Sequence, residues 1–96
     1  MNNNGTGLDK NFIIETNKKI VEEWNRTHPK QTESHWARSG EIEDIIGMIN
    51  SVVNEEKTLE NLIRKAAYTI GFISWAQPFI SANKRTGLLV AQTLIV

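Results

Sequence analysis

The stretch that decides the fold is Gln77-Pro78-Phe79-Ile80-Ser81-Ala82-Asn83-Lys84-Arg85-Thr86-Gly87. It lies between two segments whose apolar residues predict buried helices. The residue before a proline disfavours helical dihedrals, so the first helix is expected to end at Gln77. The second is expected to begin between Asn83 and Arg85. The first amide groups of a helix lack partners within it and carry partial positive charge, so this stretch predicts an anion site, usually a phosphate site.

Four residues of this stretch favour phosphate binding on chemical grounds. Lys84 supplies a point charge, and Arg85 a planar fork that holds two phosphate oxygens. Asn83 offers a donor and an acceptor and tolerates left-handed backbone, and Ala82 lets the backbone approach a ligand closely. Thr86 could cap the helix or contact the phosphate. The alternative, that the two cations merely solvate a helix start, is weakened by the apolar helices on both sides, between which unpaired charge would be costly.

Apolar residues at helical spacing predict the helix that precedes this stretch and two more before it, three in all. The first spans residues 8–24, with Asp9 as its N-cap and Ile13, Ile20 and Trp24 on one stripe. The second spans residues 41–53. The third spans residues 58–76, capped by Thr58, with an apolar stripe through Leu59, Leu62, Ile63, Ala66, Ala67, Ile70, Ile73 and Ala76.

The fold class that follows is all-α, a compact helical bundle with at most one small hairpin or flap within residues 27–38. Residues 1–7 are polar and predict a flexible tail, so the helical domain spans residues 8–96. The last helix is apolar nearly all round, which predicts a central, fully buried helix. Because no charged residue follows Arg85, we expect more chain or a partner to cover this helix, and the domain to be partial.

Composition narrows the classes of function. Eleven basic and eleven acidic side chains among 96 residues give no overall field toward nucleic acid or an anionic membrane. The absence of cysteine excludes disulfides and thiolate metal sites and fits a cytoplasmic protein, and no apolar run approaches the roughly 20 residues that span a bilayer. His28 and His35 lack the spacing of a zinc site, so no metal site is assigned.

The segment from Gln77 to Arg85 resembles the signature of the Fic/Doc family, which is His-Pro-Phe-x-Asp/Glu-Gly/Ala-Asn-Gly/Lys-Arg. The matching positions are Pro78, Phe79, Ala82, Asn83, Lys84 and Arg85. A weaker similarity to the Doc branch runs from Ser39 to Ile45. The resemblance covers residues 8–96 and implies a helical bundle with the motif on a loop between two central helices.

The resemblance also implies an activity. Family members transfer AMP, or less often another phosphate-containing group, from a nucleotide to a protein hydroxyl. Members of the Doc branch phosphorylate a protein and act as toxins paired with an antitoxin. Lys84 and Leu88 make the chain similar to that branch. The implied ligand is therefore ATP or another nucleotide, and the implied partners are a protein target or an antitoxin-like protein.

Two positions depart from the family pattern, and both carry the chemistry. Gln77 stands where the family has the histidine that acts as general base, and losing a positioned base lowers a rate by about 10²–10⁴-fold. Ser81 stands where the family has the acid that holds Mg²⁺, and a hydroxyl is a poor ligand for a hard divalent cation. The resemblance therefore implies retained phosphate binding, weak or lost transfer, and a doubtful role for Mg²⁺.

Two other classes of function place different requirements on the sequence. A helical DNA-binding module using the Asn83–Arg85 turn would need a basic face, which the neutral charge and the uncharged last helix oppose. A non-catalytic interaction module that associates through the apolar C-terminal helix stays open. It predicts concentration-dependent association, including homo-oligomers, in which the motif plays no part.

Overall fold

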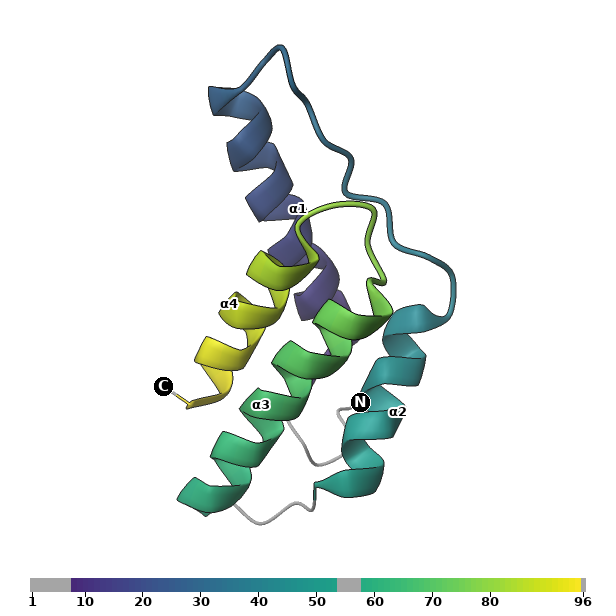
Figure 1. Cartoon of the computed structure of the whole chain (residues 1–96), viewed down its shortest axis with the longest axis vertical. Coiled ribbons are helices and arrows are strands. Elements are labelled where there is room, and N and C mark those ends of the chain that lie inside the picture. The colour runs from purple at the N-terminus through teal and green to yellow at the C-terminus, as the bar shows by residue number, and fades with distance from the viewer. Residues whose placement is uncertain (1–7, 54–57, 96) are drawn as a thin grey trace.

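The computed structural model describes residues 8–53 and 58–95, so the predicted tail of residues 1–7 lies outside the described part. Four helices follow one another: α1 (Lys10–Thr27), α2 (Glu41–Val52), α3 (Leu59–Ala76) and α4 (Asn83–Ile95) (Figure 1). The described residues contain no strand beyond one isolated antiparallel bridge between Ala37 and Phe79. The prediction of an all-α bundle is therefore confirmed. The hairpin considered within residues 27–38 is not formed, because this segment pairs with residue 79 instead of with itself.

Helix α1 begins where the sequence predicts. The Asp9 carboxylate accepts a hydrogen bond of 3.0 Å from the Phe12 amide, which satisfies one of the free amides of the first turn. The buried stripe differs from the predicted one, since it runs through Ile13, Asn17 and Val21. The stripe is displaced because α1 packs against α4 through Asn17, as described below.

Helix α2 supplies more residues to the buried apolar cluster than any other helix in the described part of the chain. Gly40 precedes it with a φ of +80°, a conformation that glycine adopts without steric cost. The helix buries one isoleucine or two per turn, namely Ile42, Ile45, Ile46 and Ile49. The apolar spacing predicts a longer stripe that also includes Val52 and Val53. Val53 is buried and Val52 is exposed, so the stripe is confirmed except at Val52. Ile73 of α3, Phe79 of the connecting loop and Val90 of α4 complete the same cluster.

Helix α3 begins at its predicted cap, where the Thr58 hydroxyl accepts a bond of 3.1 Å from the Asn61 amide. Its predicted apolar stripe is buried only in part. Ala66 and Ile73 face the bundle as predicted, but Leu59 and Ile63 are exposed and the polar residues Asn61, Lys65 and Thr69 are buried beside them. The face toward the bundle is set by close packing on α4, where a Cβ added at Gly87 would lie 3.5 Å from the Ile70 Cα.

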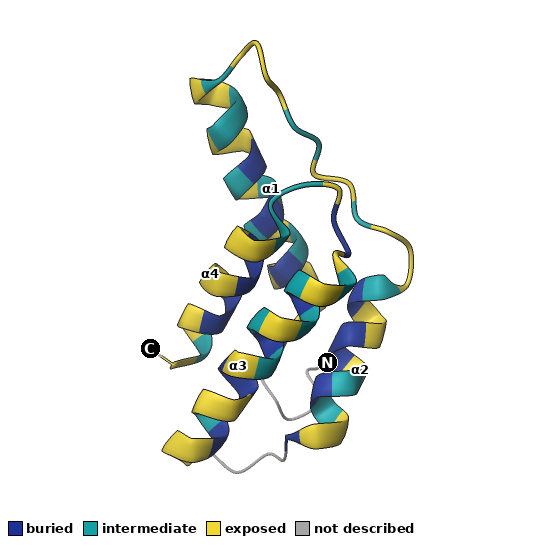
Figure 2. Cartoon of the chain, viewed as in Figure 1, coloured by how far each residue is buried: buried dark blue, intermediate teal, exposed yellow. Residues whose placement is uncertain are grey.

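Helix α4 lies alongside α3 and also contacts α1 (Figure 1). It buries Thr86, Gly87, Val90 and Ala91 and exposes the large side chains Leu88, Leu89 and Ile95. Figure 2 shows exposed residues along the outer faces of both α3 and α4. The prediction of a fully buried last helix is therefore wrong, since neighbours cover only one side of α4 in the described part of the chain.

Candidate functional site

The connection from α3 to α4, residues 77–82, is called the motif loop below. Its two ends are both in the left-handed region, with a φ of 49° at Gln77 and 64° at Ala82. This region is unfavourable for residues with a side chain unless the surroundings enforce it. The two residues turn the chain so that α4 returns along α3 (Figure 1).

Asn83 clamps the motif loop onto the start of α4. Its Oδ1 accepts a bond of 3.0 Å from the Phe79 amide, and its Nδ2 donates a bond of 2.9 Å to the Phe79 carbonyl. The side chain thus satisfies both backbone groups of one loop residue. Both ends of the Asn83 side-chain amide are therefore engaged within the loop. Its predicted contact with a phosphate stays a prediction.

Asn17 of α1 holds the same loop from the other side. This fully buried side chain donates from Nδ2 to the Ser81 carbonyl at 2.8 Å and to the Thr86 hydroxyl at 3.0 Å. Thr86 is also fully buried, so its hydroxyl faces the interior and the phosphate contact considered for it has no access from solvent. Sequence reasoning missed Asn17, although a polar residue four positions after Ile13 on an apolar stripe was a visible signal.

Arg38, in the segment before α2, is a third support. Its guanidinium donates to the Gln77 carbonyl at 2.7 Å and also to the Ala76 carbonyl, at the end of α3. Its backbone amide donates to the Pro78 carbonyl at 2.7 Å, and the Ile80 amide donates to the Trp36 carbonyl at 3.1 Å. These bonds fix the middle of the motif loop. Asn17, Arg38 and Asn83 are together called the loop frame.

The family's reactive positions make a contrast with the loop frame. Among the described hydrogen bonds, none involves the side chain of Gln77 or Ser81, and both residues are held through their backbone carbonyls. Pro78 and Phe79 are buried, as suits a structural role. The side chains at positions 77 and 81 therefore contribute little to holding the loop.

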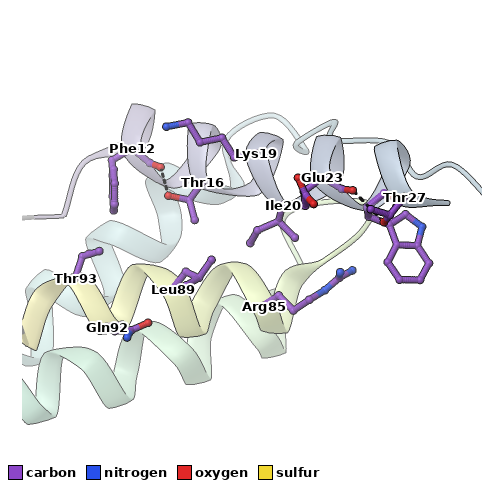
Figure 3. Close-up of a pocket in the computed structure, with 11 residues that line it drawn as sticks. Phe12, Thr16, Lys19, Ile20, Glu23, Thr27, Arg85, Leu89, Gln92 and Thr93 are labelled. Carbon is purple, nitrogen blue, oxygen red and sulfur yellow. Dashed lines mark hydrogen bonds between the residues drawn. The ribbon is translucent and has the colours of Figure 1, made fainter. Parts of the chain in front are cut away.

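The two cations of the motif stand at the start of α4. Lys84 is exposed and has no ion pair within the described residues. Arg85 is half-exposed, donates to the Glu33 carboxylate at 3.3 Å and lies 5.5 Å from the centroid of the Trp24 ring. Asn25 fixes the backbone of Glu33 with bonds of 2.7 Å and 2.9 Å. The guanidinium is thus directed toward the end of α1 (Figure 3).

A groove of about 580 Å³ separates α1 from α4 next to Arg85 (Figure 3). Its walls are mainly apolar, with charged groups along the rim, and they comprise Phe12, Thr16, Lys19, Ile20, Glu23, Trp24, Thr27, Arg85, Leu89, Gln92 and Thr93. A hydrogen bond from Arg26 lowers the pKa of Glu23 below its ordinary value, so this rim carboxylate stays ionised near neutral pH. Ile20 and Trp24 line this groove, which explains why the predicted stripe of α1 is only half-buried.

The fold and the site define a class of protein. It is a small helical domain whose central loop is fixed by hydrogen bonds and leads into a helix with two cations in its first turn. The Fic/DOC family model matches residues 7–95, which is nearly the whole chain, and the chain therefore belongs to the Fic/DOC family. No curated protein and no solved structure gives a significant match.

The donor groups at the loop do not suit the Mg²⁺ that the family uses. The motif loop contains no carboxylate, and Ser81 offers only a hydroxyl at the position of the family acid. The described residues also include no group of three histidine, cysteine or acidic side chains that could hold a metal ion. Separately, no helix among residues 8–53 and 58–95 is long and apolar enough to cross a membrane.

Proposed function

We propose that this protein binds the phosphate groups of ATP or another nucleotide at the start of α4, and that its transfer of AMP or phosphate to a protein hydroxyl is weak or lost. The observation that carries the proposal is the division within the motif loop. The loop frame is complete and does not use the side chains of Gln77 and Ser81, and Lys84 and Arg85 follow directly after it.

The first turn of α4 supports the phosphate part of the proposal. The Thr86 amide is the first to make a backbone bond, to the Ala82 carbonyl at 2.9 Å. The amides of residues 83–85 precede it, so they have no partner within the helix and lie at the positive end of its dipole. Lys84 and Arg85 add two positive charges, and the left-handed Ala82 holds this turn in place.

The residues at positions 77 and 81 support the second part. The amide side chain of Gln77 cannot take a proton from a target hydroxyl at neutral pH, and Ser81 cannot replace a carboxylate. What remains is binding and orientation of the nucleotide. A protein target or an antitoxin-like partner belongs to this proposal as a consequence of family membership, and a cytoplasmic location is proposed because the sequence has no cysteine.

Calorimetric titration of the purified chain with ATP tests the binding. We expect saturable binding that is lost or at least about tenfold weaker in Arg85→Ala, because a charge-assisted bidentate contact contributes about 1.5–3 kcal/mol. The matched control is Arg64→Ala, an arginine on α3 whose described bond goes to the Val52 carbonyl. Equal binding by both variants would contradict the proposal, as would no binding by a chain whose circular dichroism shows it to be folded.

Glu33 provides a second variant with the opposite expected sign. In the free protein the Glu33 carboxylate is paired with Arg85, so a phosphate that binds Arg85 must displace this carboxylate. Glu33→Gln removes that competition, and we expect affinity for ATP to rise by about two- to fivefold, the range that an exposed ion pair allows. Omitting Mg²⁺ should change the affinity little if Ser81 has lost the metal-holding role.

A second candidate function rests on the exposed side chains of α4. Leu88, Leu89 and Ile95 would allow a non-catalytic interaction module that associates through this helix. In that case Leu89→Glu would abolish association and the folded chain would not bind ATP. The ATP titration therefore also decides between the two candidates.

A further inference from the structure

Helix α3 exposes part of its apolar surface. Along its solvent side, residues at four-residue spacing form a row of Leu59, Ile63, Ala67, Gly71 and Trp75, and all five are exposed. The exposed fractions of Leu59, Ile63 and Trp75 are 68%, 52% and 77%. This row is called the α3 ridge, and the exposed charges Glu60 and Arg64 lie beside its N-terminal half. On its other side the helix buries Ala66 and Ile73 together with the polar residues Asn61, Lys65 and Thr69, so large apolar side chains stay in solvent while polar ones are buried.

The chain segment that forms the C-terminal half of the α3 ridge has no charged residue of its own. From Ala66 to Ile80 the sequence has no charged residue. A shallow apolar hollow of about 220 Å³ lies there, lined by Ala67, Tyr68, Gly71, Phe72 and Trp75. A contiguous exposed apolar surface of this kind is typical of a surface that another molecule covers.

We propose that the α3 ridge is the interface of a homodimer in which the α3 helices of two copies pack antiparallel. Its sequence is self-complementary, as a two-fold interface requires. With the crossing point between Ala67 and Gly71, each copy places its small residues against those of the other. Ile63 of one copy then faces the partner's Trp75. A Cβ added at Gly71 meets nothing within 4 Å, so the backbone at the crossing is open to a close approach.

The charges at the two ends of the ridge fit the same arrangement. Glu60 lies near the start of α3 and is exposed, while Arg38 is bound to the carbonyls at its end. Counted from the crossing point, both lie seven to nine residues away along the helix, on the order of 10–14 Å at 1.5 Å per residue. An antiparallel pair therefore brings each Glu60 to the end of the helix that holds the partner's Arg38. A parallel pair would place like charges together.

The exposed side chains of the ridge are large enough to contribute to a dimer interface. A stable interface buries roughly 800 Å² on each partner, and one large aromatic side chain contributes about 150–250 Å² of that. Trp75 is 77% exposed and borders the hollow, so it would be the main contributor, with Ile63 facing it across the two-fold axis. The five residues of the ridge lie outside the loop frame, so substitutions in the ridge test the dimer separately from nucleotide binding.

The test measures the mass of the chain in solution by sedimentation across a range of protein concentrations. We expect a concentration-dependent dimer whose dissociation constant rises at least about tenfold in Ala67→Glu, because a charge would be buried at the crossing point. Alanine and glutamate are both good helix formers, so the fold is expected to survive, which circular dichroism checks. Trp75→Ser provides a second disruption at the edge of the ridge.

The control variant is Leu89→Glu, which places the same charge on the exposed face of α4 and should leave the dimer unchanged. Cysteine trapping tests the orientation, because the chain has no cysteine of its own. A mixture of Ala67→Cys and Gly71→Cys should form the mixed disulfide more readily than either variant forms a disulfide with itself, whereas a parallel pair would favour the two homodisulfides. A wild-type chain that is monomeric at all concentrations, or a dimer lost in Leu89→Glu and kept in Ala67→Glu, would overturn the proposal.

Discussion

The loop frame and the two reactive positions meet at the same short loop, but they depend on the rest of the molecule in opposite ways. Asn17, Arg38 and Asn83 reach the motif loop from three different segments and bond to its backbone. Gln77 and Ser81 contribute only their carbonyl oxygens to these bonds. The shape of the loop and the chemistry at the loop therefore reside on different side chains, and one can change while the other persists.

The largest expected effect comes from removing Asn17, the fully buried member of the loop frame. Asn17→Ala deletes two hydrogen bonds and leaves the Ser81 carbonyl and the Thr86 hydroxyl without this partner. We expect the free energy of unfolding to fall by about 2–3 kcal/mol. Urea denaturation measures it, with Asn11→Ala, an exposed asparagine on the same helix, as the matched control. An equal effect of both changes would mean that Asn17 does not hold the loop.

The outer clamp should matter less. Asn83→Ala removes two bonds to Phe79, but water can reach these partly buried groups, so we expect a loss of about 1 kcal/mol. The same variant should bind ATP more weakly because the turn before Lys84 loosens. A variant with lower stability and unchanged affinity for ATP would show that the clamp does not position the phosphate site.

Relief of backbone strain at Ala82 is expected to raise the free energy of unfolding. Ala82 has a φ of 64°, which glycine adopts freely, so Ala82→Gly is expected to stabilise the protein by about 0.5–1 kcal/mol. Thermal denaturation should show a midpoint several degrees higher. Ala67→Gly is the natural comparison, since the same change inside the helical part of α3 should destabilise by about 0.5–1 kcal/mol.

The reactive positions should tolerate substitution almost without change in stability. The double change Gln77→His with Ser81→Asp restores the family residues, and we expect the free energy of unfolding to stay within about 0.5 kcal/mol of the parent. If the chain suffices for catalysis, transfer from labelled ATP to protein should rise above that of the parent. A stability loss well above 1 kcal/mol would contradict the division between frame and chemistry.

The smallest effect concerns a surface pair remote from the loop. Lys10 of α1 donates to the Glu43 carboxylate of α2 at 2.6 Å, and this bond lowers the pKa of Glu43 below 4.5. Because the pKa of Glu43 is lowered in the folded state, the contribution of this pair to the free energy of unfolding is present above pH 4.5. It is lost as the pH falls through the lowered pKa. Stability measured between pH 6 and pH 3 should therefore fall slightly less in Glu43→Gln than in the parent. An identical pH dependence would show that the pair contributes nothing.

The sequence predicted the helices and their caps well, because these depend on neighbouring residues. Asp9 and Thr58 each bond to an amide three positions ahead, and Pro78 ends α3 by local sterics. The faces of the helices were harder to predict. The apolar pattern placed Leu59 and Ile63 inward and took α4 as fully buried, since periodicity shows where apolar residues gather and not which neighbour covers them.

The site divides in the same way. Lys84, Arg85 and the two replaced positions were visible from the motif alone. Asn17, Glu33 and Arg38 were not assigned to the site, because their partners at or beside the motif loop lie between 38 and 69 positions away in the chain. Only the fold brings these side chains to the loop. The spacing of Asn17 on an apolar stripe marked it as unusual but did not indicate what it contacts.

The separation between Asn17 and its partners also has a consequence for how the chain is made and folds. The bonds from Asn17 close intervals of 64 and 69 residues, which is most of the chain. Loop closure over such intervals is entropically costly and is completed only when distant elements have come together. On the ribosome, α1 emerges long before α4, so it must remain without its buried partner until the last helix is synthesised. We therefore expect the motif loop to acquire its shape last, after α1 to α3 have collapsed.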